Sequence, residues 1–252
     1  HHRGPGLWSL LQAHLRPEPP KGPSMRIIRL SGSNTMRGLG DPDWRGAIED
    51  ADCYRLDDPA ERRSILAAGA LIISGAADHV LLYKHRTHLS GFVRDGGRIL
   101  VNGQVVLPFI DGLARWLKLD YRSPWDLRPH ALSPHPVWEG VDYRDLHFRT
   151  GVPGTHSYEQ LQEIGVAGFY GRGYSSPLPD GAVPVTGIGP NSLPLDYEFP
   201  LGAGAVLVHG GLDLEGFADE RYSSARLGPN LVAWLSPGSS AAPAAHLKEA
   251  SA

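Results

Sequence analysis

The chain has 252 residues and a mass of 27.3 kDa, and its 24 lysines and arginines against 27 aspartates and glutamates leave a formal net charge of −3. A chain of this length can bury a full hydrophobic core, and its near-neutral charge argues against a protein that binds nucleic acid. The single cysteine excludes an internal disulfide framework and a cysteine-rich zinc site. No apolar run approaches the roughly 18 residues of a membrane helix, so we expect a cytoplasmic protein with no membrane partner.

The two ends of the chain differ from its middle. Residues 1–24 begin with two histidines and end in a proline-rich stretch before Met25, which is typical of a leader or tag. A native helix over residues 7–15 that docks on the rest of the chain is the alternative. Residues 236–252 are rich in serine, alanine and proline and are expected to be a disordered tail. These boundaries predict a single domain over residues 25–235.

Four short apolar runs in the first half of this domain predict buried strands, at residues 27–30, 53–56, 70–74 and 98–101. A helical pattern follows each of them. Asp41 is expected to cap the first helix, whose apolar face extends to Ala51, and Asp58 is expected to cap the second. The third helix is expected over residues 80–94, and the fourth begins at Pro108.

This alternation predicts an α/β fold. Right-handed crossovers between successive strands give a flavodoxin-like, doubly wound and mostly parallel sheet with helices on both faces. After a loop-rich stretch over residues 120–160, further strands are expected at residues 166–170, 183–188, 195–199 and 205–209, before a closing helix at residues 230–235. The last two strands flank the turn PLGAG and are expected to form a C-terminal β-hairpin.

Ligands of such sheets bind beyond the carboxyl ends of the strands. The loops to consider are therefore residues 31–35, 75–79 and 102–106. The first of them contains Ser33 and Asn34, and its backbone N–H groups could hold an anion, but the sequence favours a plain polar turn. It lacks the glycine pattern and the lysine of a nucleotide site.

Three segments resemble the class I glutamine amidotransferase-like superfamily. The stretch ALIISGAADH, followed by LSGFVRDGGRILVNGQ, is similar to the strand, helix and Gly-Gly turn that lead into the central strand of that fold. The closing stretch GAGAVLVHGGLDLEGF, followed by GPNLVAWL, is similar to its last hairpin, histidine-bearing loop and terminal helix. HPVWEGVDYRDLHFRTGVPG further resembles the trehalose-utilisation-like branch. The resemblance covers roughly residues 25–235 and implies the same α/β fold.

The chemistry that this resemblance implies needs a cysteine thiolate at a strained elbow after the fourth strand, a histidine base and a carboxylate that orients the histidine. The elbow here reads LVNGQ over residues 100–104, and the only cysteine, Cys53, lies far from it in the sequence. The resemblance places His209 at the histidine position, with Asp213 four residues later as the carboxylate. Because the thiol is missing, we predict no glutaminase activity.

Other chemistries find less support in the sequence. No G-x-S-x-G motif occurs, so the nucleophile elbow of a serine hydrolase is missing. His85 and His88 lie one helical turn apart, near Asp78 and His79, but the stripe that they share is apolar, which favours packing over metal binding. Neither a metal ion nor another cofactor is therefore predicted.

Three functions stay open: a catalytically silent domain that binds a small molecule or assembles as a homo-oligomer, a hydrolase or isomerase of carbohydrates or small polar metabolites, and a subunit whose partner supplies the missing residues. In the enzyme, His209 would be the base, Asp213 would orient it, and Asn102 and Gln104 would be electrophilic donors. Arginines and aromatic residues between residues 142 and 174 are typical of a pocket for a sugar or a small acid. The predicted ligand-binding residues are Ser33, Asn34, Gly75, Gly103, Arg149, Tyr170, Gly210 and Gly211.

Overall fold

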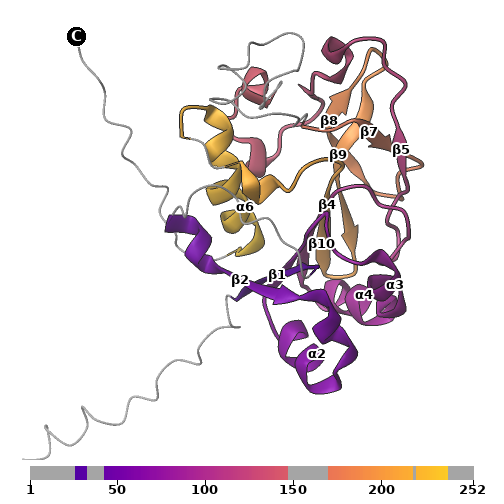
Figure 1. Cartoon of the computed structure of the whole chain (residues 1–252), viewed down its shortest axis with the longest axis vertical. Coiled ribbons are helices and arrows are strands. Elements are labelled where there is room, and N and C mark those ends of the chain that lie inside the picture. Colours follow the sequence, from indigo (N-terminus) through magenta and orange to yellow (C-terminus); the bar gives the residue numbers. More distant parts are fainter. Residues whose placement is uncertain (1–25, 33–42, 147–169, 218–219, 238–252) are drawn as a thin grey trace, which may run out of the picture.

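The computed structural model describes residues 26–32, 43–146, 170–217 and 220–237. Its main feature is an eight-stranded sheet with the strand order β2-β1-β3-β4-β10-β9-β8-β6 (Figure 1). The first five of these strands run parallel, and β9, β8 and β6 each run antiparallel to the strand before them. This arrangement confirms the predicted α/β fold with a mostly parallel sheet.

The strands of this sheet are β1 (Ile27–Ser31), β2 (Ile48–Asp52), β3 (Ala70–Ile73), β4 (Arg98–Asn102), β6 (His130–Ala131), β8 (Val183–Ile188), β9 (Leu193–Leu201) and β10 (Gly204–His209). A separate antiparallel pair is formed by β5 (Trp116–Lys118) and β7 (Gly173–Ser175). The central strands β1, β3 and β4 are almost continuously apolar and buried, as expected for parallel strands that are covered on both faces.

Two hydrophobic cores lie on the two faces of the sheet. Alternate residues of β1 point to opposite faces, so Ile28 belongs to one core and Ile27 to the other. The first core contains the inner residues of three helices, α2 (Pro59–Leu66), α3 (His79–Lys84) and α4 (Arg86–Arg94). The second core contains those of α6 (Leu227–Leu235), which lies on the other side of the sheet in Figure 1.

Short 3₁₀ helices fill several connections. They are η2 (Asp43–Ala47), η3 (Cys53–Asp57), η4 (Pro124–Leu127), η5 (Pro136–Trp138), η6 (Tyr143–Leu146), η7 (Leu214–Gly216) and η8 (Ser223–Arg226). None of the helices in the described ranges has the length and the apolar character needed to cross a bilayer.

Several predicted elements are confirmed. The strands β3, β4, β8 and β10 begin and end within one residue of the predicted bounds. The cap of α2 is also confirmed, because the Asp58 carboxylate accepts the amide N–H groups of Ala60 and Glu61 over 2.8 and 2.9 Å. The predicted hairpin is the β9–β10 pair, although β9 is longer than expected.

The prediction of the second strand and of the helix before it was wrong. The helix expected from Asp41 to Ala51 is only the short η2, and the chain then continues as the edge strand β2. The expected strand over residues 53–56 is instead η3. Pairing with β1 overrides the helical pattern here, since Arg26 binds Glu49 and Arg29 contacts Asp50 across the strand pair.

The prediction of a helix that begins at Pro108 was also wrong. Residues 103–115 form an irregular loop with a turn at Asp111 and Gly112, and β5 follows at Trp116. Tertiary contacts hold this segment: the amide N–H of Ala114 donates to the Tyr197 hydroxyl, and that of Trp116 donates to the Val105 carbonyl. The helix expected over residues 80–94 is divided at His85 into α3 and α4. The strand expected at residues 166–170 lies almost wholly outside the described residues.

Candidate functional site

Three glycine turns meet at the carboxyl ends of neighbouring parallel strands. Gly75, Gly103 and Gly210 follow β3, β4 and β10 in that order. The amide N–H of Gly103 donates to the carbonyl of His209 over 2.9 Å. A Cβ atom on Gly103 would lie only 2.7 Å from the Cα atom of Gly75. The turns therefore lie side by side, at the edge where ligands of such sheets bind.

The residue at the expected elbow is Gly103. Its φ angle of +90° lies in the left-handed region, where an L side chain is strained. The close approach of Gly75 leaves no space for a Cβ atom either. Cys53 is fully buried as the first residue of η3, and burial raises the pKa of its thiol. The elbow turn is thus present without a nucleophile.

A buried arginine lies beneath these turns, and the sequence analysis did not anticipate it. Arg29 projects from the middle of β1 into the second core, where its guanidinium donates to Asp213 and to Glu215, each over 2.6 Å. Burial lowers the pKa of Arg29, but the charges of the two carboxylates raise it above its usual value. Burial raises the pKa of Glu215, and the nearby charge of Asp213 adds to this effect.

Asp213 and Asn102 hold a loop in place. The Asp213 carboxylate accepts the Ser74 hydroxyl over 2.7 Å and the Gly75 amide N–H over 2.8 Å. The Asn102 side chain donates to Glu215 over 3.0 Å and accepts the amide N–H of Leu214 over 3.1 Å. These contacts anchor the loop at Asp213, Leu214 and Glu215 to the ends of β3 and β4. Both polar atoms of the Asn102 side chain therefore have partners within the protein.

The predicted partner of His209 was wrong. Asp213 was expected to orient this histidine, but it binds Arg29, while Asp196 of β9 accepts from Nδ1 of His209 over 2.5 Å. The register explains the pairing, because His209 and Asp196 are directly opposite each other in the β9–β10 hairpin and so point to the same face. Counting outward from the predicted five-residue PLGAG turn pairs His209 with Leu195, but in the structure Leu201 pairs with Gly204, and this shift of one residue brings Asp196 opposite His209.

Asp196 is held by further buried donors. The Tyr170 hydroxyl donates to it over 2.9 Å, and the Thr186 hydroxyl also donates to it. The Trp138 indole N–H in turn donates to the Tyr170 hydroxyl over 3.0 Å. Tyr170 was expected to bind a ligand, but its ring is buried and packs against the His209 ring at a centroid distance of 4.5 Å.

His209 keeps one ring nitrogen without a partner. The side chain is fully buried, and its Nε2 atom has no hydrogen-bond partner among the described residues. Gly211 lies against this atom: a Cβ atom there would be 2.9 Å from Nε2 and still closer to the carbonyl of Tyr170. An imidazole with a carboxylate on Nδ1 and a free Nε2 is the arrangement of a general base. In this structure it is sealed from solvent.

The other predicted site residues are distributed differently. Gly75, Gly103, Gly210 and Gly211 lie together with His209 at the sheet edge. Gln104 follows this turn, and its side chain is exposed. Ser33, Asn34 and Arg149 lie outside the described residues.

The histidines of the third helical region make separate contacts. His85 is buried, and its Nε2 atom lies 2.7 Å from the Asp57 carboxylate. His79 packs on Phe109 at a centroid distance of 5.0 Å, and burial lowers its pKa. Within the described ranges, no three histidine, cysteine or acidic side chains are close enough to hold a metal ion.

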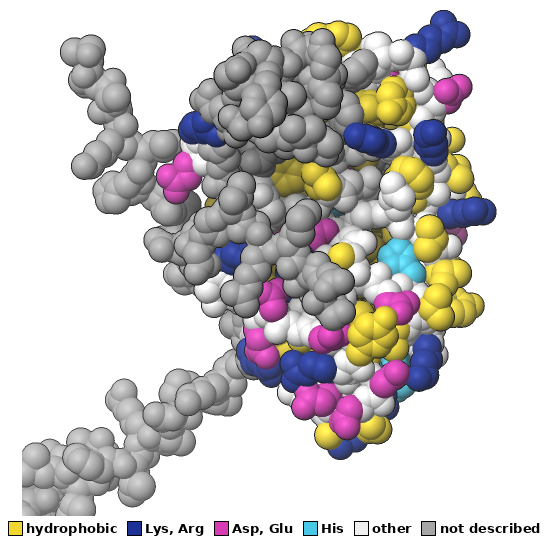
Figure 2. Space-filling view, viewed as in Figure 1, with side chains coloured by type: hydrophobic (Ala, Val, Ile, Leu, Met, Phe, Trp, Pro, Cys, Tyr) yellow, Lys and Arg dark blue, Asp and Glu magenta, His cyan; other side chains and the backbone are white. Residues whose placement is uncertain are grey.

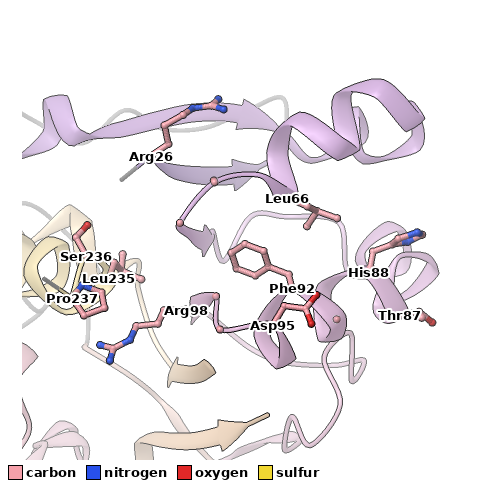
Figure 3. A pocket seen from close by; sticks show the side chains of 15 residues that line it. Arg26, Leu66, Thr87, His88, Phe92, Asp95, Arg98, Leu235, Ser236 and Pro237 are labelled. Atoms are coloured by element: carbon pink, nitrogen blue, oxygen red, sulfur yellow. The ribbon is translucent and has the colours of Figure 1, made fainter. Parts of the chain in front are cut away.

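A groove of about 600 Å³ opens at the opposite edge of the sheet, where the parallel strands begin (Figure 3). Leu66, Phe92 and Leu235 give it apolar walls, and Arg98 lies at its rim. The Arg98 guanidinium donates to the carbonyl of Trp234 over 2.6 Å and stacks on the indole ring. The groove is therefore separate from the glycine turns.

No protein-family model matches the sequence, and neither does any curated protein. Among solved structures, the chain is similar to cytoplasmic protein STM3548 from Salmonella typhimurium, with 15% identity and a TM-score of 0.47 over 83% of this chain and 98% of that one. It is similar to cytoplasmic protein STM1381 from Salmonella typhimurium LT2, with 13% identity and a TM-score of 0.44 over 84% and 100%. A cold-adapted β-galactosidase from Rahnella sp. R3 shares 10% identity at a TM-score of 0.43, over 84% of this chain and 31% of the enzyme.

Proposed function

We propose that this chain is a class I glutamine amidotransferase-like domain of the trehalose-utilisation-like branch, with a flavodoxin-like, doubly wound sheet, that lacks glutaminase activity. It serves instead as a cytoplasmic small-molecule-binding or assembly module. The observation that carries this proposal is Gly103, which occupies the elbow after β4 with a φ of +90° and no space for a side chain. Amide hydrolysis through a thioester needs a nucleophile at that position.

The hydrogen bonds around the elbow support the same function. In an enzyme, Asp213 would orient His209 and Asn102 would face the substrate. Instead, Asp213 binds Arg29 and Ser74, and Asn102 binds Glu215 and the amide N–H of Leu214. Such internally paired networks hold a loop in one conformation. The loop after β10 is therefore held rigidly at the carboxyl ends of the parallel strands.

A glutamine hydrolysis assay tests the missing activity. Purified protein is incubated with glutamine, and released ammonia is measured with a coupled dehydrogenase. We expect no release above the protein-free blank. Ammonia production at an ordinary enzymatic rate that disappears in His209→Asn would overturn the proposal, whereas a trace that persists in this variant comes from a contaminating enzyme.

A thermal-shift screen tests ligand binding. The expected ligand is a sugar or a small carboxylic acid. A ligand present at about 100 times its dissociation constant stabilises the folded state by roughly 2.7 kcal/mol, which is a readily measured rise in melting temperature. A screen in which no sugar, acid, nucleotide or amino acid raises the melting temperature would leave assembly as the function.

His209 favours one alternative, a hydrolase or isomerase that acts on a carbohydrate or small polar metabolite. The specific observation is its free Nε2 atom with Asp196 on Nδ1. In this alternative, any activity found in a substrate screen would be abolished by His209→Asn and lowered by Asp196→Asn. An activity that survives both substitutions would exclude this pair as its catalytic base.

A further inference from the structure

Four large apolar side chains are exposed around α3. Val80 and Tyr83 lie one turn apart on the helix and are 72% and 42% exposed, and the neighbouring Tyr54 and Val106 are 51% and 61% exposed. Scattered exposed apolar residues are ordinary, but a group on one surface marks an interaction site. We call these four residues the α3 patch.

Hydrogen bonds show that the α3 patch is continuous. On one side, the Tyr54 hydroxyl donates to Asp78, the N-cap of α3, over 2.8 Å. On the other side, the amide N–H of Val106 donates to Nδ1 of His79 over 3.4 Å. Both flanking segments therefore touch the first turn of the helix. Figure 2 shows hydrophobic side chains mixed with acidic and basic ones on the lower right of this face, where α3 lies.

The two ends of the α3 patch carry opposite charge. Asp78 caps the start of α3 and Asp52 caps the start of the neighbouring η3, and neither aspartate forms an ion pair within the described part of the chain. At the other end of the helix, Lys84 binds Asp57 over 2.7 Å. Arg86, the first residue of α4, lies over the Tyr83 ring and shares the Asp111 carboxylate with Arg94 from the end of α4, at 2.9 and 2.6 Å. This end therefore keeps an excess of positive charge.

We propose that the α3 patch is the surface through which two copies of this chain associate. A two-fold axis through the middle of α3 places the apolar centre of one copy on that of the other, and the acidic end of each copy then faces the basic end of its partner. The patch on one copy is therefore complementary, in its apolar centre and in its charges, to the same patch on a second copy. This inference rests on the proposal that the chain is an assembly module, and it identifies the surface through which the chain would assemble.

Sedimentation of the full chain over a range of concentrations tests this proposal. The wild-type protein is expected to shift from a mass of 27.3 kDa to twice that value as its concentration rises. Val80→Glu places a charge at the centre of the patch and is expected to keep the protein at the monomer mass. Glutamate in the first turn of a helix is favourable, so this variant should fold, which circular dichroism checks.

Matched lysine substitutions locate the surface. Val80→Lys is expected to weaken association as Val80→Glu does, whereas Val183→Lys, at a similarly exposed valine on β8, is expected to leave it unchanged. A monomer at every concentration would overturn the proposal, and so would a dimer that tolerates both substitutions of Val80. Neither result bears on the glutamine assay, so the two proposals fail separately.

Discussion

At the scale of single residues, Gly103 decides which chemistry the sheet edge can carry. Gly103→Ala adds a Cβ atom 2.7 Å from Gly75 at a φ of +90°, so we expect it to lower the free energy of unfolding by about 1–3 kcal/mol. Urea unfolding followed by circular dichroism measures the loss. Gly91→Ala is the control, because a Cβ atom there meets nothing within 4 Å in the helix α4, and alanine should stabilise it by up to about 1 kcal/mol. Equal stability of the two variants would contradict the close approach.

Tyr170 holds the buried polar group around His209 together. Tyr170→Phe removes the hydroxyl that joins Trp138 to Asp196 and leaves a buried indole N–H without its partner. We expect a loss of about 1–3 kcal/mol in the free energy of unfolding. Tyr54→Phe removes an exposed hydroxyl that binds Asp78, and its effect should stay within about 0.5 kcal/mol. If the two changes cost the same, the Tyr170 contacts are not energetically distinct from a surface contact.

Individual polar residues are also where sequence reasoning is weakest. His209 and Gly103 could be located, because His209 ends one predictable apolar strand and Gly103 directly follows another. Arg29 could not, since one charged residue inside the run IIRLS looks like an interruption of a buried strand rather than the centre of an ion-pair network. Its partners lie more than 180 residues later in the chain, so no local pattern connects them.

At the scale of elements, the loop over residues 210–217 depends on one buried cation. Arg29→Met leaves the buried Glu215 without its counter-charge, and we expect a loss of about 3–5 kcal/mol in the free energy of unfolding. Arg26→Met removes the bidentate contact to Glu49 at the beginning of the same strand, where both side chains are exposed, and should cost at most about 1 kcal/mol. Chemical unfolding of both variants measures the two losses in the free energy of unfolding. A small loss for Arg29→Met would mean that water reaches Glu215 and replaces the missing counter-charge.

Elements were predictable where local and tertiary preferences agree. α2 has a capping aspartate and a proline in its first turn, and β3 and β4 are short apolar runs between turn residues. The segment 41–51 has a helical apolar spacing, yet the free edge of β1 captures its second half as β2. A sequence pattern cannot show that an edge is available for pairing, because this depends on strands elsewhere in the chain.

At the scale of the whole molecule, one sheet separates two cores that have no buried residue in common. Ile65 of α2 lies in the first core and Ile188 of β8 in the second, and both are almost fully buried. Substitution of either by valine should lower the free energy of unfolding by about 0.5–1.5 kcal/mol, and the double variant should lose the sum within about 0.5 kcal/mol. Because both cores share the strands between them, unfolding followed by far-ultraviolet dichroism and by tryptophan fluorescence should give a single coincident transition. Two separate transitions, each shifted by only one of the substitutions, would mean that the two cores unfold independently.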